Sequence, residues 1–279
     1  MEKNQYWNKK VVLITGGSSG IGLAVAKQLS VAGAQVWLTA RRRGLLEAAL
    51  QEVQAARRDP SQLCGIVPGD VSDPLQVAWV VETVTKSAGA PDVVINSAGL
   101  SQPGYVQELS LEDYERLIRV NYLGTVYVTK AVLPAMISRG TGHIINLSSM
   151  AGVMGVFGYT AYGATKYAVS GFSEALRAEM KPHGIRVSVV FPPDTDTAEL
   201  AYEQPFKPAE LKAISGTTKP LSAETVARSI LRQAEKGAFM IFPGMDSRLF
   251  YLAATKLPKS LVFAILDQMA ASGKKAKNT

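Results

Sequence analysis

The sequence of 279 residues contains only one cysteine, Cys64, and two histidines, His143 and His183. A single thiol excludes an internal disulfide framework and is typical of proteins from a reducing compartment. So few imidazole and thiolate groups provide no zinc-ligand spacing, and we expect that no metal is needed. Cys64 lies in the apolar run 63–67, so we expect its thiol to belong to a buried strand rather than to act as a nucleophile.

Long hydrophobic runs are missing as well. Residues 1–10 are polar and charged, without the apolar central stretch of a signal peptide. The chain has no run of about 18 uncharged apolar residues, which is the length that a membrane-spanning helix needs. Together these absences predict a cytoplasmic protein.

The net charge is +7, with 30 Lys and Arg residues against 23 Asp and Glu residues. Such an excess is typical of proteins with an anionic partner, whether a nucleic acid, a membrane surface or an acidic cofactor. The positive residues form no single long block, and no nucleic-acid recognition motif occurs. We therefore expect no nucleic-acid partner.

Short apolar runs rich in branched residues alternate with stretches of helical periodicity, which is typical of a parallel sheet covered on both faces. The sequence predicts an α/β fold, a doubly wound parallel sheet of Rossmann type, as a single domain with a C-terminal helical extension. The expected strands are Val11–Ile14, Gln35–Thr39, Cys64–Val67, Val93–Ile95, His143–Leu147, Arg186–Phe191 and Phe239–Phe242. The expected helices are Gly22–Val31, Leu45–Ala56, Pro74–Ser87, Leu111–Met136 and Tyr162–Lys181.

A glycine-rich turn follows the first expected strand and opens the first expected helix. Its spacing is Gly-x-x-x-Gly-x-Gly rather than the Gly-x-Gly-x-x-Gly of the general dinucleotide fingerprint. Glycines let a diphosphate approach the backbone, and a helix N-terminus offers unpaired N–H groups. We expect the cofactor phosphates to be bound here by Thr15, Gly16, Ser18, Ser19, Gly20, Ile21 and Gly22.

The end of the second expected strand indicates which dinucleotide is used. Sites that prefer NAD usually place an acid there to bind the ribose 2′-hydroxyl, whereas this chain has Ala40 followed by Arg41 and Arg42. Guanidinium groups pair with a 2′-phosphate through charge-assisted hydrogen bonds, to which Ser18 can add a hydroxyl. The alternative is a basic helix start, which the helix dipole disfavours. The sequence therefore predicts NADP(H).

Two further loops follow strands at the edge where open α/β sheets bind ligands. Asp70 and Val71 follow the third expected strand, and Asp70 can accept a hydrogen bond from the adenine amino group. Asn96, Ala98 and Gly99 follow the fourth, where small residues allow close approach to the ribose. Each loop alone could be an ordinary turn, but together with the glycine turn they predict one continuous cofactor edge.

Tyr162 and Lys166 are four residues apart and would share one face of a helix. An ammonium near a phenol lowers the phenol pKa and makes it a usable acid or base. Ser149 follows the fifth expected strand and could hold a substrate oxygen, and Asn121 lies within a long expected helix that it could kink. Tyr and Lys at this spacing are often a surface pair, so the interpretation depends on the cofactor edge upstream.

From about Val11 to Phe242 the chain resembles the short-chain dehydrogenases/reductases. The resemblance rests on Thr15–Gly22, Asn96–Gly99, Asn121, Ser148-Ser149 and Tyr162-x-x-x-Lys166. It implies that Tyr162 donates a proton to a carbonyl as NADPH delivers hydride, and that Lys166 lowers the tyrosine pKa and binds the nicotinamide ribose. It also implies that Ser149 positions the substrate, that Asn121 maintains a proton relay through water, and that the protein is a homodimer or homotetramer.

A narrower resemblance is to the 3-ketodihydrosphingosine reductases. It rests on the segment 191–197, with Pro-Pro-Asp-Thr-Asp-Thr after the sixth strand, and on residues 158–162 and 214–218. It implies NADPH-dependent reduction of a lipid-like 3-keto sphingoid base, with Pro192, Thr195 and Thr197 beside the nicotinamide. The alternatives are a reductase of another bulky ketone, either a 3-oxoacyl thioester or a steroid, and an NADP-binding regulatory protein.

The last part of the chain completes the expected organisation. The catalytic domain would span residues 8–245 with a substrate lid near 195–220, for which a disordered surface loop is the alternative. Residues 246–279 would form a helical extension with a basic tail, because Lys256, Pro258 and Lys259 interrupt its apolar stretches. Helices that pack on the domain or on a second subunit are the first expectation, and a peripheral membrane contact through 249–277 is the second.

Overall fold

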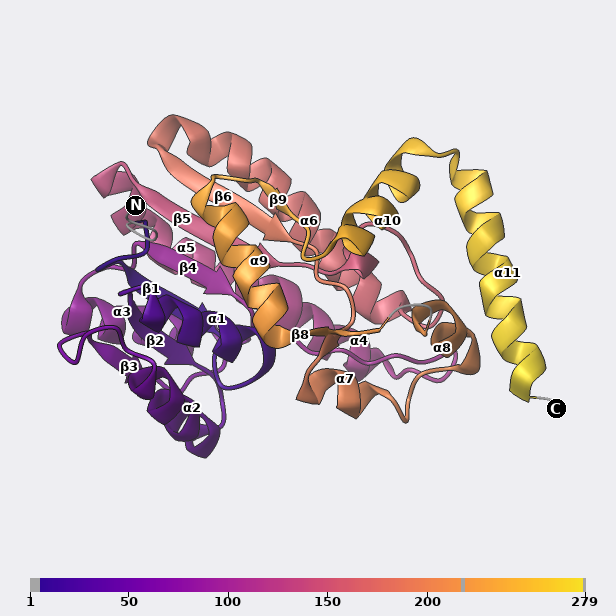
Figure 1. Ribbon diagram of the computed structural model, residues 1–279, viewed down its shortest axis with the longest axis horizontal. Helices are drawn as coiled ribbons and strands as arrows, with labels where there is room; N and C mark the ends of the chain where they lie inside the picture. Colours follow the sequence, from indigo (N-terminus) through magenta and orange to yellow (C-terminus); the bar gives the residue numbers. More distant parts are fainter. Residues whose placement is uncertain (1–5, 217–218, 278–279) are drawn as a thin grey trace.

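The computed structural model describes residues 6–216 and 219–277 and contains a seven-stranded, fully parallel sheet (Figure 1). The strand order is β3-β2-β1-β4-β5-β6-β9, so the order reverses between β1 and β4. Ligands in open α/β sheets bind outside the carboxyl ends of the strands at this reversal. The strands are β1 (Val11–Thr15), β2 (Gln35–Thr39), β3 (Cys64–Ile66), β4 (Val93–Asn96), β5 (Gly142–Leu147), β6 (Ile185–Val190) and β9 (Met240–Ile241).

Helices cover both faces of the sheet, because successive residues of each buried strand point to opposite sides. Val12 and Ile14 of β1 join one apolar core with α1 (Gly20–Val31), α2 (Arg43–Ala55) and α9 (Ala223–Glu235). Val11 and Leu13 join the other core with α3 (Pro74–Ala88), α5 (Gly124–Arg139) and α6 (Thr160–Met180). The predicted doubly wound α/β fold is thereby confirmed.

Two local expectations need correction. Cys64 is partly exposed rather than buried, since β3 is an edge strand that pairs only with β2. The single helix expected over 111–136 is divided into α4 (Leu111–Leu117), a π-helical turn (Ile118–Leu123) and α5. Asn121 lies in this π turn, the class of irregularity that often occurs at functional sites.

Between β6 and α9 the chain forms a small separate unit instead of a structureless loop. It contains β7 (Thr195–Asp196), α7 (Ala198–Glu203), α8 (Ala209–Ser215) and β8 (Leu221–Ser222), which pairs with β7. We call residues 195–216 the lid. Thr217 and Thr218, which were part of the expected lid and of the sphingoid-reductase resemblance, lie outside the described residues.

The chain ends in α10 (Met245–Lys256) and α11 (Lys259–Lys277), and α11 runs alongside α8 at one end of the molecule (Figure 1). The two helices meet closely, because a Cβ on Gly273 would lie 2.4 Å from the backbone oxygen of Ala209. Nineteen-residue α11 is longer than the short helix expected there. The side chains of the basic tail from Lys274 onward, and residues 278–279, lie outside what the structure describes.

Two 3-10 turns, Met150–Gly152 and Lys181–His183, flank α6. None of the helices in the described part of the chain has the length and apolar character that crossing a membrane requires.

Candidate active site

A cavity of about 990 Å³ opens at the carboxyl edge of the sheet, below the lid and beside the C-terminal helices. Most of the predicted site residues line it. They are Gly16, Ser18, Ser19, Gly20, Ile21, Gly22, Arg41, Arg42, Asp70, Val71, Ala98, Gly99, Ser149, Tyr162, Lys166, Pro192, Thr195 and Thr197. The lining does not include Thr15, Asn96 and Asn121, whose side chains are buried in the protein.

The glycine turn has the geometry of a phosphate cradle. Gly16 and Gly20 have φ values of +65° and +55°, which side chains rarely adopt. A Cβ on Gly22 would lie 2.4 Å from the backbone oxygen of Gly16, so the first turn of α1 packs directly on the loop. Ser19 at the start of α1 makes no side-chain capping bond, and the first turn contains no acidic residue. The N-terminal N–H groups are therefore available to an anion, and the turn fits a dinucleotide diphosphate.

Thr15 holds this turn against the loop after β4. Its Oγ1 accepts hydrogen bonds from the backbone N–H groups of Ser97 and Ala98, both at 3.1 Å. Asn96 has a comparable supporting position, since its Nδ2 donates to Asn146 Oδ1 at 2.8 Å inside the core. Both residues were predicted to bind cofactor; the structure buries their side chains beneath the predicted cofactor edge, and a cofactor contact of either residue stays a prediction.

Arg41 and Arg42 are exposed at the end of β2 and line the cavity. Neither forms an ion pair with another described side chain, whereas Arg43 pairs with Glu47 at 2.8 Å and stays outside the lining. On the neighbouring edge, Asp70 Oδ1 accepts bonds from the N–H and hydroxyl of Ser72 at 2.9 and 2.8 Å. Two guanidinium groups are thus available for a phosphate at this end of the cavity.

Tyr162, Ser149 and Lys166 come together at the opposite end. The Ser149 hydroxyl lies close enough to Tyr162 to act on its pKa, and it accepts the Ala151 N–H at 3.2 Å. Lys166 Nζ lies 5.6 Å from the Tyr162 ring centre and donates to the Leu147 carbonyl at 3.1 Å. Ser148 and Ser149 both line the cavity, but Ser148 is 4% exposed and its hydroxyl is used in hydrogen bonds to the Lys166 carbonyl and Ser170.

Asn121 ties three segments together from the π turn. Its Oδ1 accepts from the Leu100 N–H at 2.8 Å, and its Nδ2 donates to the Leu100 carbonyl and to Thr165 Oγ1, both at 2.9 Å. A Cβ on Gly99 would lie 3.4 Å from Lys166 Nζ and 3.5 Å from Asn121 Oδ1. Both amide hydrogens of Asn121 are used within the protein, and the side chain fixes the loop that borders Lys166.

The electrostatics of this end differ from the sequence expectation. Burial raises the pKa of Tyr162 well above its usual value, and the carboxylates of Glu199, Glu203 and Asp194 add to that rise while the Ser149 hydrogen bond opposes it. Burial also lowers the pKa of Lys166, with Glu199 acting in the opposite direction. In this state Tyr162 is fully protonated, which is the form that donates a proton.

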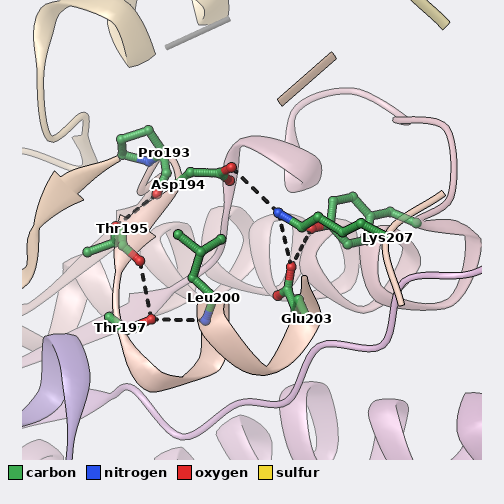
Figure 2. Close-up of polar contacts among 8 residues, drawn as sticks. Pro193, Asp194, Thr195, Thr197, Leu200, Glu203 and Lys207 are labelled. Atoms are coloured by element: carbon green, nitrogen blue, oxygen red, sulfur yellow. Dashed lines mark hydrogen bonds and ion pairs between the residues drawn. The ribbon is translucent and has the colours of Figure 1, made fainter. Parts of the chain in front are cut away.

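The lid is fixed by a buried ion cluster that sequence reasoning missed (Figure 2). The Lys207 side chain is 1% exposed, and its Nζ lies 3.4 Å from Glu203 Oε2 and 3.6 Å from Asp194 Oδ2. The hydroxyl of Tyr159 donates to the same Glu203 oxygen at 2.7 Å. Asp194 and Glu203 thereby have a cationic partner, and α7 is attached to the catalytic helix through Tyr159.

The segment before α7 turns sharply (Figure 2), and its residues Thr195 and Thr197 line the cavity. Thr195 donates its hydroxyl hydrogen to the Pro193 carbonyl at 2.9 Å, and Thr197 donates to the Thr195 carbonyl at 3.2 Å. Thr197 also caps α7 by accepting the Leu200 N–H at 3.3 Å. Both hydroxyl hydrogens are therefore used within the segment, and both residues line the cavity.

Beyond Tyr162 the cavity continues between the lid and the C-terminal helices. Its walls there are apolar and come from the loop before α6, from α8, and from α10 and α11. The lining side chains include Met154, Val156, Leu211, Phe250, Ala254, Leu257, Val262, Ile265, Leu266 and Met269. No short motif marks these residues in the sequence, since ordinary helix packing produces the same apolar spacing.

The sequence is similar to one protein family and to individual proteins of known name. A family model described as short chain dehydrogenase matches residues 10–207. A 3-ketodihydrosphingosine reductase from Bos taurus is 38% identical over 264 residues, which cover 94% of this chain and 80% of the relative. A 3-dehydrosphinganine reductase from Danio rerio is 39% identical over 257 residues, covering 92% and 77% of the two chains. Both resemblances inferred from the motifs are confirmed.

Solved structures agree on the fold. A short chain dehydrogenase/reductase from Burkholderia phymatum, solved in complex with NAD, superposes with a TM-score of 0.79 at 23% identity. The superposition covers 88% of this chain and 92% of that one. The β3-to-β9 sheet and its flanking helices are thus the common framework.

The two threonines at the ends of β1 and β2 provide a matched test of the cofactor edge. Thr15→Val leaves the Ser97 and Ala98 N–H groups without an acceptor, and each such group costs about 1–3 kcal/mol. We expect the free energy of unfolding, measured by urea titration, to fall by about 2–4 kcal/mol. Thr39, its register partner, is equally buried but its hydroxyl has no partner among the described residues, so Thr39→Val should change stability by less than about 1 kcal/mol. Equal losses in the two variants would contradict this account.

Proposed function

Because the chain belongs to the short-chain dehydrogenase family, an oxidoreductase family acting on ketones and alcohols, we propose that it reduces the 3-keto group of a long-chain sphingoid base with NADPH. The observation that carries this proposal is the continuity of the cavity. One end holds the Tyr162–Ser149 pair, and the apolar part between lid and C-terminal helices starts directly beside it. Ligand sites usually measure about 300–1,000 Å³, so this cavity of about 990 Å³ is at the upper end of that range.

Each residue of the catalytic group has a task that its geometry supports. Ser149 and Tyr162 would bind the carbonyl oxygen, and Tyr162 would transfer its phenolic proton to that oxygen. A nicotinamide dinucleotide, when bound, supplies the hydride. The buried Lys166 would stabilise the phenolate left behind and bind the ribose, while Asn121 keeps the loop beside Lys166 in place. The predicted water relay through Asn121 would then depend on the second lone pair of Oδ1 or on the backbone of the π turn.

Substrate and mechanism are tested together by following NADPH oxidation with 3-ketosphinganine, acetoacetyl thioester and a ketosteroid. We expect turnover with the sphingoid ketone, and a fall of about 10²-fold or more in kcat for Tyr162→Phe because general acid catalysis is lost. Tyr167→Phe is the control, since Tyr167 is on the same helix but its hydroxyl bonds the Val153 carbonyl outside the cavity lining.

Turnover confined to the thioester would remove the sphingoid proposal. Cofactor binding without turnover of any ketone would favour the regulatory alternative, and an unimpaired Tyr162→Phe variant would remove Tyr162 from the proposed role.

Preference for NADP(H) over NAD(H) would come from Arg41 and Arg42. Arg41→Ala should raise the KM for NADPH by about 10–100-fold, because a hydrogen bond to a charged group is worth about 1.5–3 kcal/mol, and should leave the KM for NADH nearly unchanged. Arg43→Ala is the matched control, as Arg43 is adjacent but pairs with Glu47. Steady-state kinetics with both cofactors provide the measurement, and a similar change for NADH and NADPH would contradict a 2′-phosphate contact.

The C-terminal extension would bring the enzyme to its lipid. We propose a peripheral contact with an anionic membrane, since Leu249, Leu252, Leu261 and Phe263 are 42–58% exposed beside Lys256 and Lys259. These four side chains point away from the cavity, whose lining comes from other residues of α10 and α11. Assembly into a dimer or tetramer stays a prediction.

Vesicle co-sedimentation tests the contact. The double change Leu261→Ser and Phe263→Ser should weaken binding to phosphatidylserine-containing vesicles by about 10-fold or more, because each apolar side chain contributes about 1.5–3 kcal/mol. Leu75→Ser with Trp79→Ser, two exposed positions on α3, is the control. Binding that is unchanged by the first pair would contradict the membrane contact.

A further inference from the structure

Glu199 brings a carboxylate to the catalytic end of the cavity. It lies in the first turn of α7, just after the cap Thr197, and lines the cavity together with Tyr162 and Lys166. The backbone N–H of Ser101, in the loop after β4, acts on its carboxylate and favours the charged form. Its charge acts on both Tyr162 and Lys166, so it lies within electrostatic range of the reacting groups.

Three cavity-lining acids in and beside the lid, Asp194, Glu199 and Glu203, are not equivalent. Lys207 lies within 3.6 Å of Asp194 and of Glu203, and Glu203 also receives the Tyr159 hydroxyl. Glu199 forms no ion pair with any side chain among residues 6–216 and 219–277, and the cation that acts on it is Lys166. Lys166 is itself directed to the Leu147 carbonyl. Glu199 is thus the acid of the lid that lines the cavity without an ion pair to another described side chain, since Asp196 and Glu210 lie outside the lining.

Ser101 provides a second and independent indication of a ligand. It is 5% exposed and lines the same cavity, yet its hydroxyl has no hydrogen-bond partner in the described part of the chain. A buried hydroxyl without a partner costs free energy, so such a group points to a ligand that completes it. The cavity that contains Tyr162 is therefore also lined by a carboxylate, Glu199, and by Ser101 with its unsatisfied hydroxyl.

We infer that Glu199 and Ser101 form a subsite for a protonated amine on the carbon next to the reacting ketone. The inference rests on the proposed function, because a 3-keto sphingoid base carries an ammonium at C2, adjacent to the carbonyl carbon. An ammonium has three N–H donors and no acceptor, which matches two acceptors that line the same cavity. With the ketone oxygen at Tyr162 and Ser149, the alkyl chain would extend into the apolar part of the cavity.

The subsite also distinguishes the candidate substrates. A 3-oxoacyl thioester and a ketosteroid carry no ammonium at this position, so neither would offset the negative charge of the Glu199 carboxylate. Glu199 is exposed at the cavity, yet desolvation by the surrounding protein raises the pKa of its carboxyl, with Glu203 adding to the rise and Lys166 and the Ser101 N–H opposing it. A bound ammonium favours the charged form, so amine binding and ionisation of Glu199 reinforce each other.

The test compares 3-ketosphinganine with its N-acetyl derivative, whose amide nitrogen carries no charge. For Glu199→Gln we expect kcat/KM for 3-ketosphinganine to fall by about 10–100-fold, because a hydrogen bond between charged groups is lost. The kcat/KM for the N-acetyl derivative should change less than about 3-fold. Ser101→Ala should lower kcat/KM for 3-ketosphinganine by about 3–10-fold and leave kcat/KM for the N-acetyl derivative unchanged. Asp196→Asn, an exposed acid on the same segment outside the lining, should change neither.

A loss shared equally by both substrates would overturn the inference, because Glu199 would then act through Tyr162. Unchanged kinetics for both substrates in Glu199→Gln would overturn it as well. Calorimetric binding of sphinganine and N-acetylsphinganine separates this question from turnover. If the wild-type protein reduces neither ketone, the proposed function fails. Tighter binding of sphinganine than of N-acetylsphinganine, lost in Glu199→Gln, would still support the amine subsite. Equal binding of the two compounds by the wild-type protein would contradict the subsite.

Discussion

The close approach of two backbone segments at the reversal point of the sheet is the constraint on which the site depends. Thr15 accepts the N–H groups of Ser97 and Ala98, and a Cβ on Gly16 would lie 2.8 Å from the Ala98 backbone. The loop held in this way leads directly to Gly99, beside Lys166 and Asn121. A displacement of the glycine turn would therefore move both the phosphate cradle and the border of the catalytic lysine.

The lid completes the site through buried charge rather than through apolar packing alone. Lys207 attaches α7 to the segment after β6, and Tyr159 attaches it to the start of α6. Removing one member of such a buried cluster leaves an uncompensated charge, which is why clusters of this kind fix one arrangement. In this arrangement Glu199 lines the same cavity as Tyr162, and residues of α8 and α11 line its apolar part.

The order of strands and most of the cofactor edge could be predicted because each depends on local patterns. Branched apolar runs identify buried strands, and a glycine turn between strand and helix has few other uses. The π turn at Asn121 could not be predicted, since helical periodicity continues through it. Glu199 and Ser101 escaped prediction, because their interest arises from the packing of distant segments around one cavity and from a missing partner. Lys207 and Glu203 have the i,i+4 spacing of an ordinary helix-surface pair, so their burial could not be read from the sequence. Thr15 and Asn96 were predicted as cofactor residues, and their side chains lie below the edge.

The charges around Tyr162 connect substrate recognition with proton transfer. Burial and the lid carboxylates raise the pKa of the phenol, so it retains its proton until a substrate arrives, and Glu199 is the largest of the charge contributions. A substrate that brings an ammonium to Glu199 would offset that contribution and lower the phenol pKa at the moment when the carbonyl oxygen needs the proton. Ketones without an amine would leave the phenol a weaker acid. The same carboxylate would then select the substrate twice, once through binding and once through the acidity of Tyr162.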